Sequence, residues 1–147
     1  MTPVVEKVEV IPVAGRDSML LNLSGAHAPY FTQNVVLMTD STGATGAGEV
    51  PGGEKIRRKL EECIPLVEGT SLGEWKNTLG KVREFLDRTT GKDVRGAQTF
   101  DLRTGVHVVT AIEAPLLDLM GKFLEVPAAA LMGDGIQRER VRFLSYL

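Results

Sequence analysis

The chain has 147 residues, 43% hydrophobic and 24% charged, a balance that predicts one ordinary globular domain with enough chain for a core. Its formal net charge of −2 offers no basic field, so neither nucleic acid nor a membrane surface is expected as a partner. The single cysteine, Cys63, excludes an internal disulfide. Because the amino terminus shows no signal-peptide pattern and no apolar run is long enough to span a bilayer, we expect a cytoplasmic protein.

The first predicted element is a strand over Val4–Val13, a stretch rich in β-branched residues. Pro12 cannot donate a backbone hydrogen bond, so it should mark an edge or an end of a sheet. A second, nearly all-apolar strand is predicted over Asn34–Thr39.

A hairpin turn is predicted at Asp40–Gly43, with Gly43 free to adopt positive φ. The chain then returns as a third strand over Ala44–Val50. Gly46 and Gly48 weaken this strand and mark either a bulge or a close backbone approach. The three strands together predict an antiparallel meander, which needs one face covered.

The connection between the first two strands, Leu20–Asn34, is much longer than a hairpin needs, and such loops are generally functional or disordered. Its apolar residues argue against disorder, while Asn22 and His27 supply polar groups between them. This mixture suits a loop folded over a ligand. The alternative is an ordered Ω-loop in which His27 bonds only to backbone.

Two helices should follow and cover the sheet. In the first, apolar residues recur at helical spacing, and Pro65 should end its regular part. These residues are Ile56, Leu60, Cys63 and Val67. The charged residues between them indicate a solvated face. The second helix should begin with Ser71 as N-cap and Glu74 three residues later, a capping-box pattern.

The longest predicted helix covers Thr104–Phe123. Pro115 inside it should produce a kink or a break, because proline removes one helical hydrogen bond. A surface loop is predicted before this helix, over Thr89–Gly96, and a short turn after it, at Pro127–Leu131.

Val141–Leu147 has the composition of one more strand. An exposed apolar strand is an aggregation hazard, so it should pair either with a sheet whose other strands are missing here or with the edge of the meander.

Individual motifs carry little chemistry. The glycine-rich run before the first helix could hold an anion on backbone N–H groups, but it lacks the spacing of a phosphate-binding loop, and turn geometry explains it better. His107 lies within a helical pattern, so a structural role is predicted for it rather than a role as a ligand. Asp101 and Arg103 read as a cap or surface pair, and no Cys/His cluster has zinc-ligand spacing.

The order of elements and four longer stretches resemble the amino-terminal capping domain of the enolase superfamily and, within it, the glucarate dehydratase family. The stretches are VIPVAGRDSMLLNLSGAHAPYFTQN (Val10–Asn34), GEVPGGEKIR (Gly48–Arg57), QTFDLRT (Gln98–Thr104) and LMGDG (Leu131–Gly135). Pro115 departs from this family, whose helix is expected to carry an ordinary helix former there.

The resemblance implies an α+β fold, in which the three-stranded meander and helical bundle form a capping domain over residues 1–135. Residues 136–147 would then begin a TIM-type barrel that is otherwise absent, since a full barrel takes about 250 residues. In the family, Mg²⁺ held by the barrel assists removal of the proton α to a carboxylate, and loss of water completes a hydro-lyase reaction on a diacid such as D-glucarate. The family's bases and metal ligands have no counterpart here, so this chain should hold no catalytic residue and be inactive alone.

The resemblance also implies substrate-binding positions. His27 in the SGAHAP stretch, Thr99 in QTFD and Tyr146 near the end of the chain correspond to substrate-contacting residues, and Asn22 is a weaker candidate. Imidazole, hydroxyl, phenol and amide groups can all hydrogen-bond to a sugar diacid.

The expected partners are a small sugar diacid, the missing barrel domain and, for the full-length protein, further copies of itself. Two alternatives stay open. The chain could be a stand-alone binding or regulatory module for sugar diacids, or a subunit that docks on a separately encoded barrel.

Overall fold

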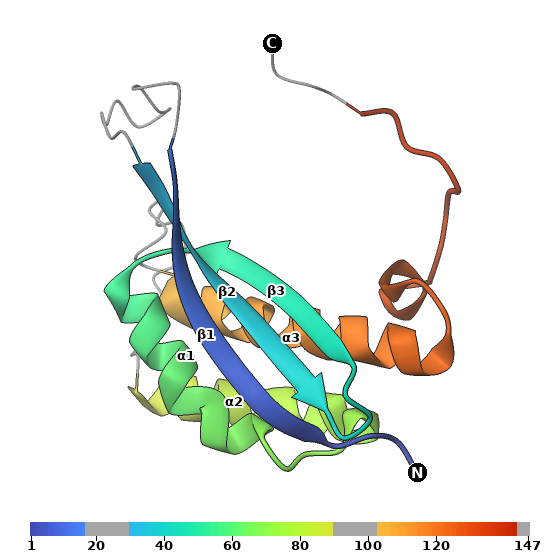
Figure 1. Ribbon diagram of the computed structural model, residues 1–147, viewed down its shortest axis with the longest axis horizontal. Coiled ribbons are helices and arrows are strands. Elements are labelled where there is room, and N and C mark those ends of the chain that lie inside the picture. Colours follow the sequence, from blue (N-terminus) through green and yellow to red (C-terminus); the bar gives the residue numbers. More distant parts are fainter. Residues whose placement is uncertain (17–29, 90–102, 144–147) are drawn as a thin grey trace.

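The computed structural model describes residues 1–16, 30–89 and 103–143. A three-stranded sheet is followed by helices that pack on one of its faces, as predicted for an enolase-like capping domain (Figure 1). The strands are β1 (Val5–Arg16), β2 (Tyr30–Asp40) and β3 (Thr45–Pro51). The helices are α1 (Glu54–Val67), α2 (Trp75–Thr89) and α3 (Thr104–Leu124), with short 3-10 turns η1 (Leu72–Glu74) and η3 (Ala128–Leu131).

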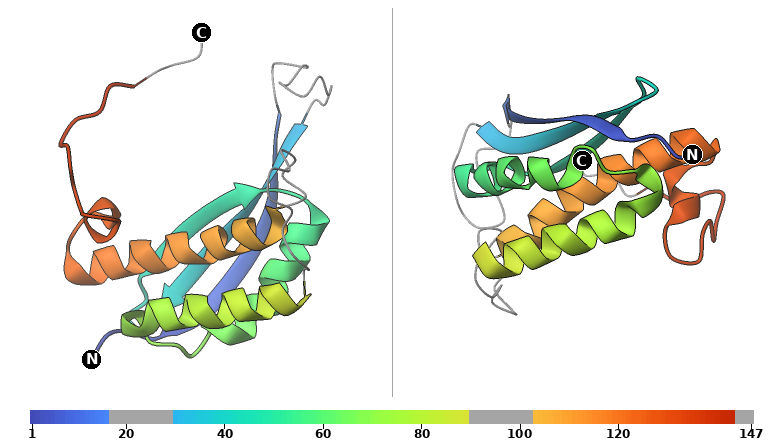
Figure 2. Two further views of the ribbon diagram at one scale, coloured as in Figure 1. Left: turned by 180° about the vertical axis from the view of Figure 1, so that it is seen from behind. Right: turned by 90° about the horizontal axis from the view of Figure 1, so that it is seen from below.

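The sheet is an antiparallel meander of order β1-β2-β3, and the three helices lie below it when it is seen edge-on (Figure 2). Along β2, alternate residues are buried against the helices because successive side chains point to opposite faces. Val36 and Met38 are fully buried there and join one core with residues of all three helices, such as Leu60 and Leu119.

Both long strands extend further than predicted. Tyr30–Gln33, which we expected in the loop, is paired with the end of β1, so the β1–β2 ribbon projects beyond β3. The pairing of Tyr30 with Arg16 leaves residues 17–29 for the connection. Pro12 lies on an edge strand, as expected from its missing N–H.

The β2–β3 hairpin is held by the side chain of Asp40. Its carboxylate accepts hydrogen bonds from the backbone N–H of Thr42 (2.8 Å), the hydroxyl of Thr42 (2.6 Å) and the backbone N–H of Ala44 (3.2 Å). Gly43 has φ of 82°, which confirms the predicted use of positive φ in this turn.

Helix α1 packs with the predicted apolar residues inward, and Cys63 among them is fully buried. Burial raises the pKa of the Cys63 thiol to about 12, so it is a packing residue and not a nucleophile. The prediction that Pro65 ends the regular helix is wrong, because α1 continues to Val67. A proline in the last turn removes only one hydrogen bond, and packing of Val67 in the core offsets that loss.

The start of the second helix differs from the predicted capping box. The chain enters through η1, and the side chain of Ser71 makes no capping bond. Its hydroxyl instead hydrogen-bonds to that of Thr2 (2.5 Å), while Val4 forms an isolated bridge with Ser71. Contact with the amino terminus has therefore displaced the local cap.

Of the kink or break predicted at Pro115, the break does not occur, because α3 runs through Pro115 without interruption. At this point the helix lies close to β3. The carbonyl oxygen of Ala111, which Pro115 leaves without its helical donor, lies 2.8 Å from the position that a Cβ on Gly48 would occupy. A Cβ on Gly46 would meet the carbonyl oxygen of Pro115 at 2.3 Å. The glycines thus allow α3 to lie directly on the strand, which confirms the predicted close backbone approach.

The same helix also covers the free edge of β3. The backbone N–H of Ala47 donates to Asp118 Oδ2 (3.1 Å), and Lys122 Nζ donates to the carbonyl oxygen of Thr45. Lys122 and Asp118 form an ion pair of 3.1 Å one helical turn apart. Two backbone groups of an edge strand are therefore occupied by side chains of the helix.

After α3 the chain turns at η3, as predicted for Pro127–Leu131, and then leaves the body of the domain (Figure 1). The strand predicted over Val141–Leu147 is not present in its described part, since Val141–Phe143 has no regular secondary structure. A strand requires a paired neighbour, and the described strands do not pair with these residues.

Candidate functional site

The four predicted substrate-binding residues lie outside the described residues. Asn22 and His27 fall within 17–29, Thr99 within 90–102 and Tyr146 within 144–147. The described residues that flank two of these segments nevertheless lie on one side of the domain. The carboxyl end of α2 and the amino end of α3 lie on the same side as the projecting tips of β1 and β2, on the left in Figure 1 (Figures 1 and 2).

A hollow of about 370 Å³ lies between the β1–β2 ribbon and the start of α1. It is lined by Pro12, Val13, Ala14, Thr32, Gln33, Asn34, Gly53, Glu54 and Arg57. Its walls are apolar on β1, amide and hydroxyl groups on β2, and charged groups on α1.

Asn34 fixes the shape of this hollow. It is only 1% exposed, and its Nδ2 donates to the carbonyl oxygen of Pro51 (3.3 Å). The backbone N–H of Gly52 donates to the carbonyl oxygen of Thr32 (2.8 Å), and a Cβ on Gly52 would lie 2.3 Å from Thr32 Oγ1. The Pro51–Gly53 turn is consequently held tightly against β2, which places the first turn of α1 beside the ribbon.

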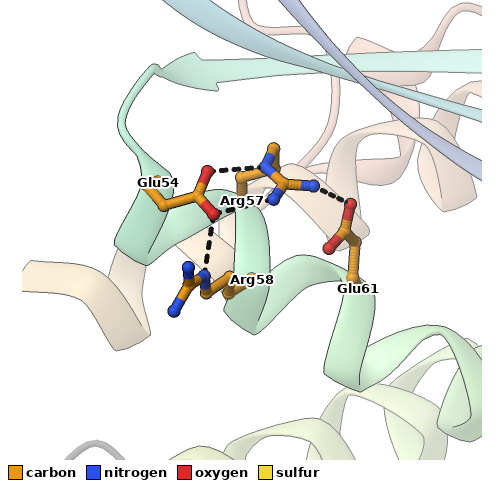
Figure 3. A network of polar contacts seen from close by, with 4 residues as sticks. All are labelled: Glu54, Arg57, Arg58 and Glu61. Carbon is orange, nitrogen blue, oxygen red and sulfur yellow. Dashed lines mark hydrogen bonds and ion pairs between the residues drawn. The ribbon is translucent and has the colours of Figure 1, made fainter.

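An ion network covers the first turns of α1 (Figure 3). Glu54 accepts two hydrogen bonds from Arg57, both of 2.8 Å, and one of 2.7 Å from Arg58. Arg57 also donates to Glu61. The network has equal numbers of positive and negative groups, so it orders the helix start without giving it net charge.

The electrostatics of the network follow from these contacts. The hydrogen bonds from Arg57, and then from Arg58, hold the pKa of Glu54 at about 2. The bond to Glu54 raises the pKa of Arg57 above its usual value. Both groups stay ionised at neutral pH, and Glu54 is unsuited to act as a general acid.

These charges form a hydrogen-bonded network, whereas the sequence pattern predicts only a solvated face. The spacing i, i+3 and i, i+4 from Glu54 to Arg57 and Arg58 was the signal that could have found the network. His107 lies in α3, as predicted. Within residues 1–16, 30–89 and 103–143, no group of three or more His, Cys, Asp or Glu side chains could hold a metal ion. The described residues therefore do not fit a magnesium site.

A second hollow, of about 510 Å³, lies between the start of α2, the middle of α3 and the chain after η3. Trp75, Leu117 and Met132 supply apolar walls, while Lys76 and Glu113 lie at its borders. Lys76 Nζ rests 5.3 Å from the centre of the Trp75 ring, a cation–π contact that occupies one face of the indole.

No family model matches this chain. Its fold is shared with solved enolase structures. One, from Pseudomonas fluorescens with bound magnesium, potassium and tartrate, superimposes with a TM-score of 0.82 and 26% identity over 100% of this chain and 35% of that one. Another, from Thermobispora bispora with magnesium and formate, gives 0.79 and 27% over 98% of this chain and 34% of that one. The chain thus has the fold of the amino-terminal capping domain of the enolase superfamily.

Within that superfamily, the sequence is similar to a probable glucarate dehydratase of Streptomyces coelicolor, with 29% identity over 95% of this chain. The chain spans 34% of the length of that relative. Both comparisons agree with the resemblance seen in the sequence, and in both the chain spans about a third of the length of the larger protein that it matches. No helix among the described residues is long and apolar enough to cross a membrane.

Proposed function

We propose that this chain is the substrate-capping part of a dehydratase that acts on a sugar diacid such as D-glucarate. The observation that carries the proposal is the similarity to a glucarate dehydratase across 95% of the chain. The tartrate bound to the enolase of Pseudomonas fluorescens adds support, because tartrate is a small diacid with hydroxyl groups.

In this proposal His27, Thr99 and Tyr146 bind the diacid, with Asn22 as an additional contact. A shared role for His27 and Thr99 is supported by the described residues that flank their segments, because the ends of β1, β2, α2 and α3 lie on one side of the domain. The network at Glu54 and the Asn34 contact would keep the base of the ribbon in place while substrate is bound.

We further propose that catalysis requires groups outside this chain. The solved enolase structures from Pseudomonas fluorescens and Thermobispora bispora hold magnesium, whereas the described residues offer no cluster of metal ligands. A barrel carrying the metal and the bases would complete the enzyme, and the 147-residue chain alone would be inactive. We also propose that the full-length protein forms a homo-oligomer and is cytoplasmic.

The test is a dehydratase assay of the gene product purified from its own cell, with D-glucarate and Mg²⁺ and with release of the 5-keto-4-deoxy sugar acid as the readout. His27→Ala should lower kcat/KM at least tenfold, about the value of one lost hydrogen bond to a charged group. Lys81→Ala, at an exposed position of α2, is the matched control and should leave kcat/KM unchanged. Absence of dehydration would overturn the proposed function. Equal activity of the His27 and Lys81 variants would overturn the assignment of His27 to the substrate site.

A further inference from the structure

The face of the sheet that points away from the helices, here called the outer face, is unusually apolar for a solvent-exposed surface. The register assigns to it alternate residues of each strand. They are Lys7, Glu9, Ile11, Val13 and Gly15 on β1, Phe31, Gln33, Val35, Leu37 and Thr39 on β2, and Thr45, Ala47, Glu49 and Pro51 on β3. An antiparallel sheet with one solvated face normally alternates apolar and polar residues. The middle strand departs from this pattern, because Phe31, Val35 and Leu37 occupy the outer face of β2.

The apolar residues of the outer face form a continuous group. Ile11 pairs with Val35, and both adjoin Leu37 and Val13 in the neighbouring rows. Ile11 is 39% exposed, Val13 is 41% exposed and Phe31 is 50% exposed. The Phe31 ring lies over Gly15, where a Cβ would come within 2.3 Å of it, so the group continues along the ribbon.

Both edges of the sheet are poorly suited to strand addition. On β3, Asp118 and Lys122 occupy two backbone groups. On β1, Val5 exchanges hydrogen bonds with Thr70 (2.9 Å) and Gly69 (2.8 Å). Further along β1, the N–H of Val8 donates to Glu68 Oε1 (2.9 Å), and Pro12 has no N–H to offer. Association through this sheet is therefore directed to its face.

The size and charge of the outer face fit a second copy of the chain. Strands of about 35 Å, spaced about 4.8 Å apart, give a face of about 500 Å², so two copies would bury about 1,000 Å², the lower bound for a specific interface. Its charged residues are few, and Lys7 and Glu9 already pair at 2.8 Å. Glu49 is the remaining charge, so two copies would meet with little repulsion.

We propose that the outer face is an interface through which two copies of this chain pack, sheet against sheet, as a reversible dimer. Aligned packing of two sheets about 10 Å apart would interleave Ile11, Val13, Val35 and Leu37 of one copy with those of the other. The inference is independent of the substrate proposal, because it involves none of the four predicted substrate-binding residues. Val13 is shared with the lining of the hollow at the start of α1.

Sedimentation equilibrium of the 147-residue chain tests the proposal. The unmodified chain should show a concentration-dependent mass that approaches twice that of the monomer. Ile11→Lys places a charge in the centre of the interface and is present in both copies, so the dimer dissociation constant should rise about tenfold for each copy, or about a hundredfold. The matched control is Val106→Lys, the same type of change at a residue of α3 that is 54% exposed, and it should leave the constant unchanged.

A second variant separates this interface from association through the end of the chain. Phe143→Ser removes an aromatic side chain that is 96% exposed after α3, and the proposal predicts no effect on the dimer. The proposal is overturned if the chain is a monomer at all concentrations, if Phe143→Ser abolishes the dimer, or if Ile11→Lys and Val106→Lys weaken it equally. Circular dichroism of Ile11→Lys should match that of the unmodified chain, because Ile11 lies outside the core.

Discussion

The two faces of the sheet both carry apolar residues, but only the inner face is buried. On the inner face, Val36 and Met38 are fully buried, and glycines on β3 let α3 approach the backbone. On the outer face, Ile11 and Val13 keep 39% and 41% of their surface exposed. The difference shows that the helices, and not the apolar content of the strands, decide which face becomes the core. Four predictions sharpen this comparison.

The largest effect is expected at the glycine contact of the inner face. In Gly46→Val, the Cβ would lie 2.3 Å from the carbonyl oxygen of Pro115 and 2.9 Å from Leu119 Cγ, so α3 must move off the strand. We expect a loss of about 3 kcal/mol or more in the free energy of unfolding, measured by urea denaturation. Gly80→Ala is the control, since nothing lies within 4 Å of its Cβ position in α2 and alanine favours helix by up to about 1 kcal/mol. Equal stability of the two variants would show that α3 is not packed on β3 in this way.

Neighbouring residues of β2 compare the two faces directly. Met38→Ala removes a fully buried side chain and should cost about 2–5 kcal/mol. Leu37→Ala changes the preceding residue, which points to the outer face and is only partly buried, and should cost less than about 1.5 kcal/mol in the monomer. Chemical denaturation at low chain concentration measures both. A reversed order would mean that the register of β2 is shifted by one residue.

A smaller effect is expected at the protected edge of β3. Asp118→Ala removes the acceptor for the N–H of Ala47 and the partner of Lys122, and should cost about 1 kcal/mol. Asp118→Asn keeps an acceptor oxygen and should recover much of that loss. Thermal unfolding of both variants distinguishes the hydrogen bond from the ion pair, because equal losses would assign the whole effect to charge.

The smallest effect concerns pH and the network on α1. The pKa of Glu54 is about 2 in the folded chain, below its ordinary value of 4.5, so its contribution to stability is present above pH 4.5 and is lost as pH falls from there towards 2. Glu54→Gln should remove this part of the pH dependence. NMR titration of the Glu54 carboxyl measures the pKa itself, and a value near 4.5 would show that the network does not persist in solution.

Much of the fold could be predicted because local patterns and tertiary packing agree. The meander, the turn at Asp40–Gly43 and the apolar sides of α1 and α3 all appear where periodicity and turn residues indicate. The break predicted at Pro115 does not occur. The packing of this helix on the glycines of β3 is a contact between residues far apart in sequence, which local patterns do not show. The predicted cap at Ser71 is absent for a similar reason, because the Ser71 hydroxyl hydrogen-bonds to the hydroxyl of Thr2, which is also distant in sequence.

The candidate site was only partly accessible to sequence reasoning. The hollow beside Asn34 depends on a tight turn between β3 and α1, which composition alone does not specify. The spacing of Glu54, Arg57 and Arg58 indicates ion pairs on one helix face, but these charges were predicted only to face solvent. His27, Thr99, Tyr146 and Asn22 rest on family resemblance, and their role stays a prediction.

The most direct test of the central proposal, that this chain is the capping part of a larger dehydratase, is the intact mass of the gene product as its own cell makes it. The proposal predicts a mass tens of kilodaltons above the 15.9 kDa of this chain, because a barrel takes about 250 further residues. A product of 15.9 kDa, with no barrel protein bound to it, would contradict the proposal.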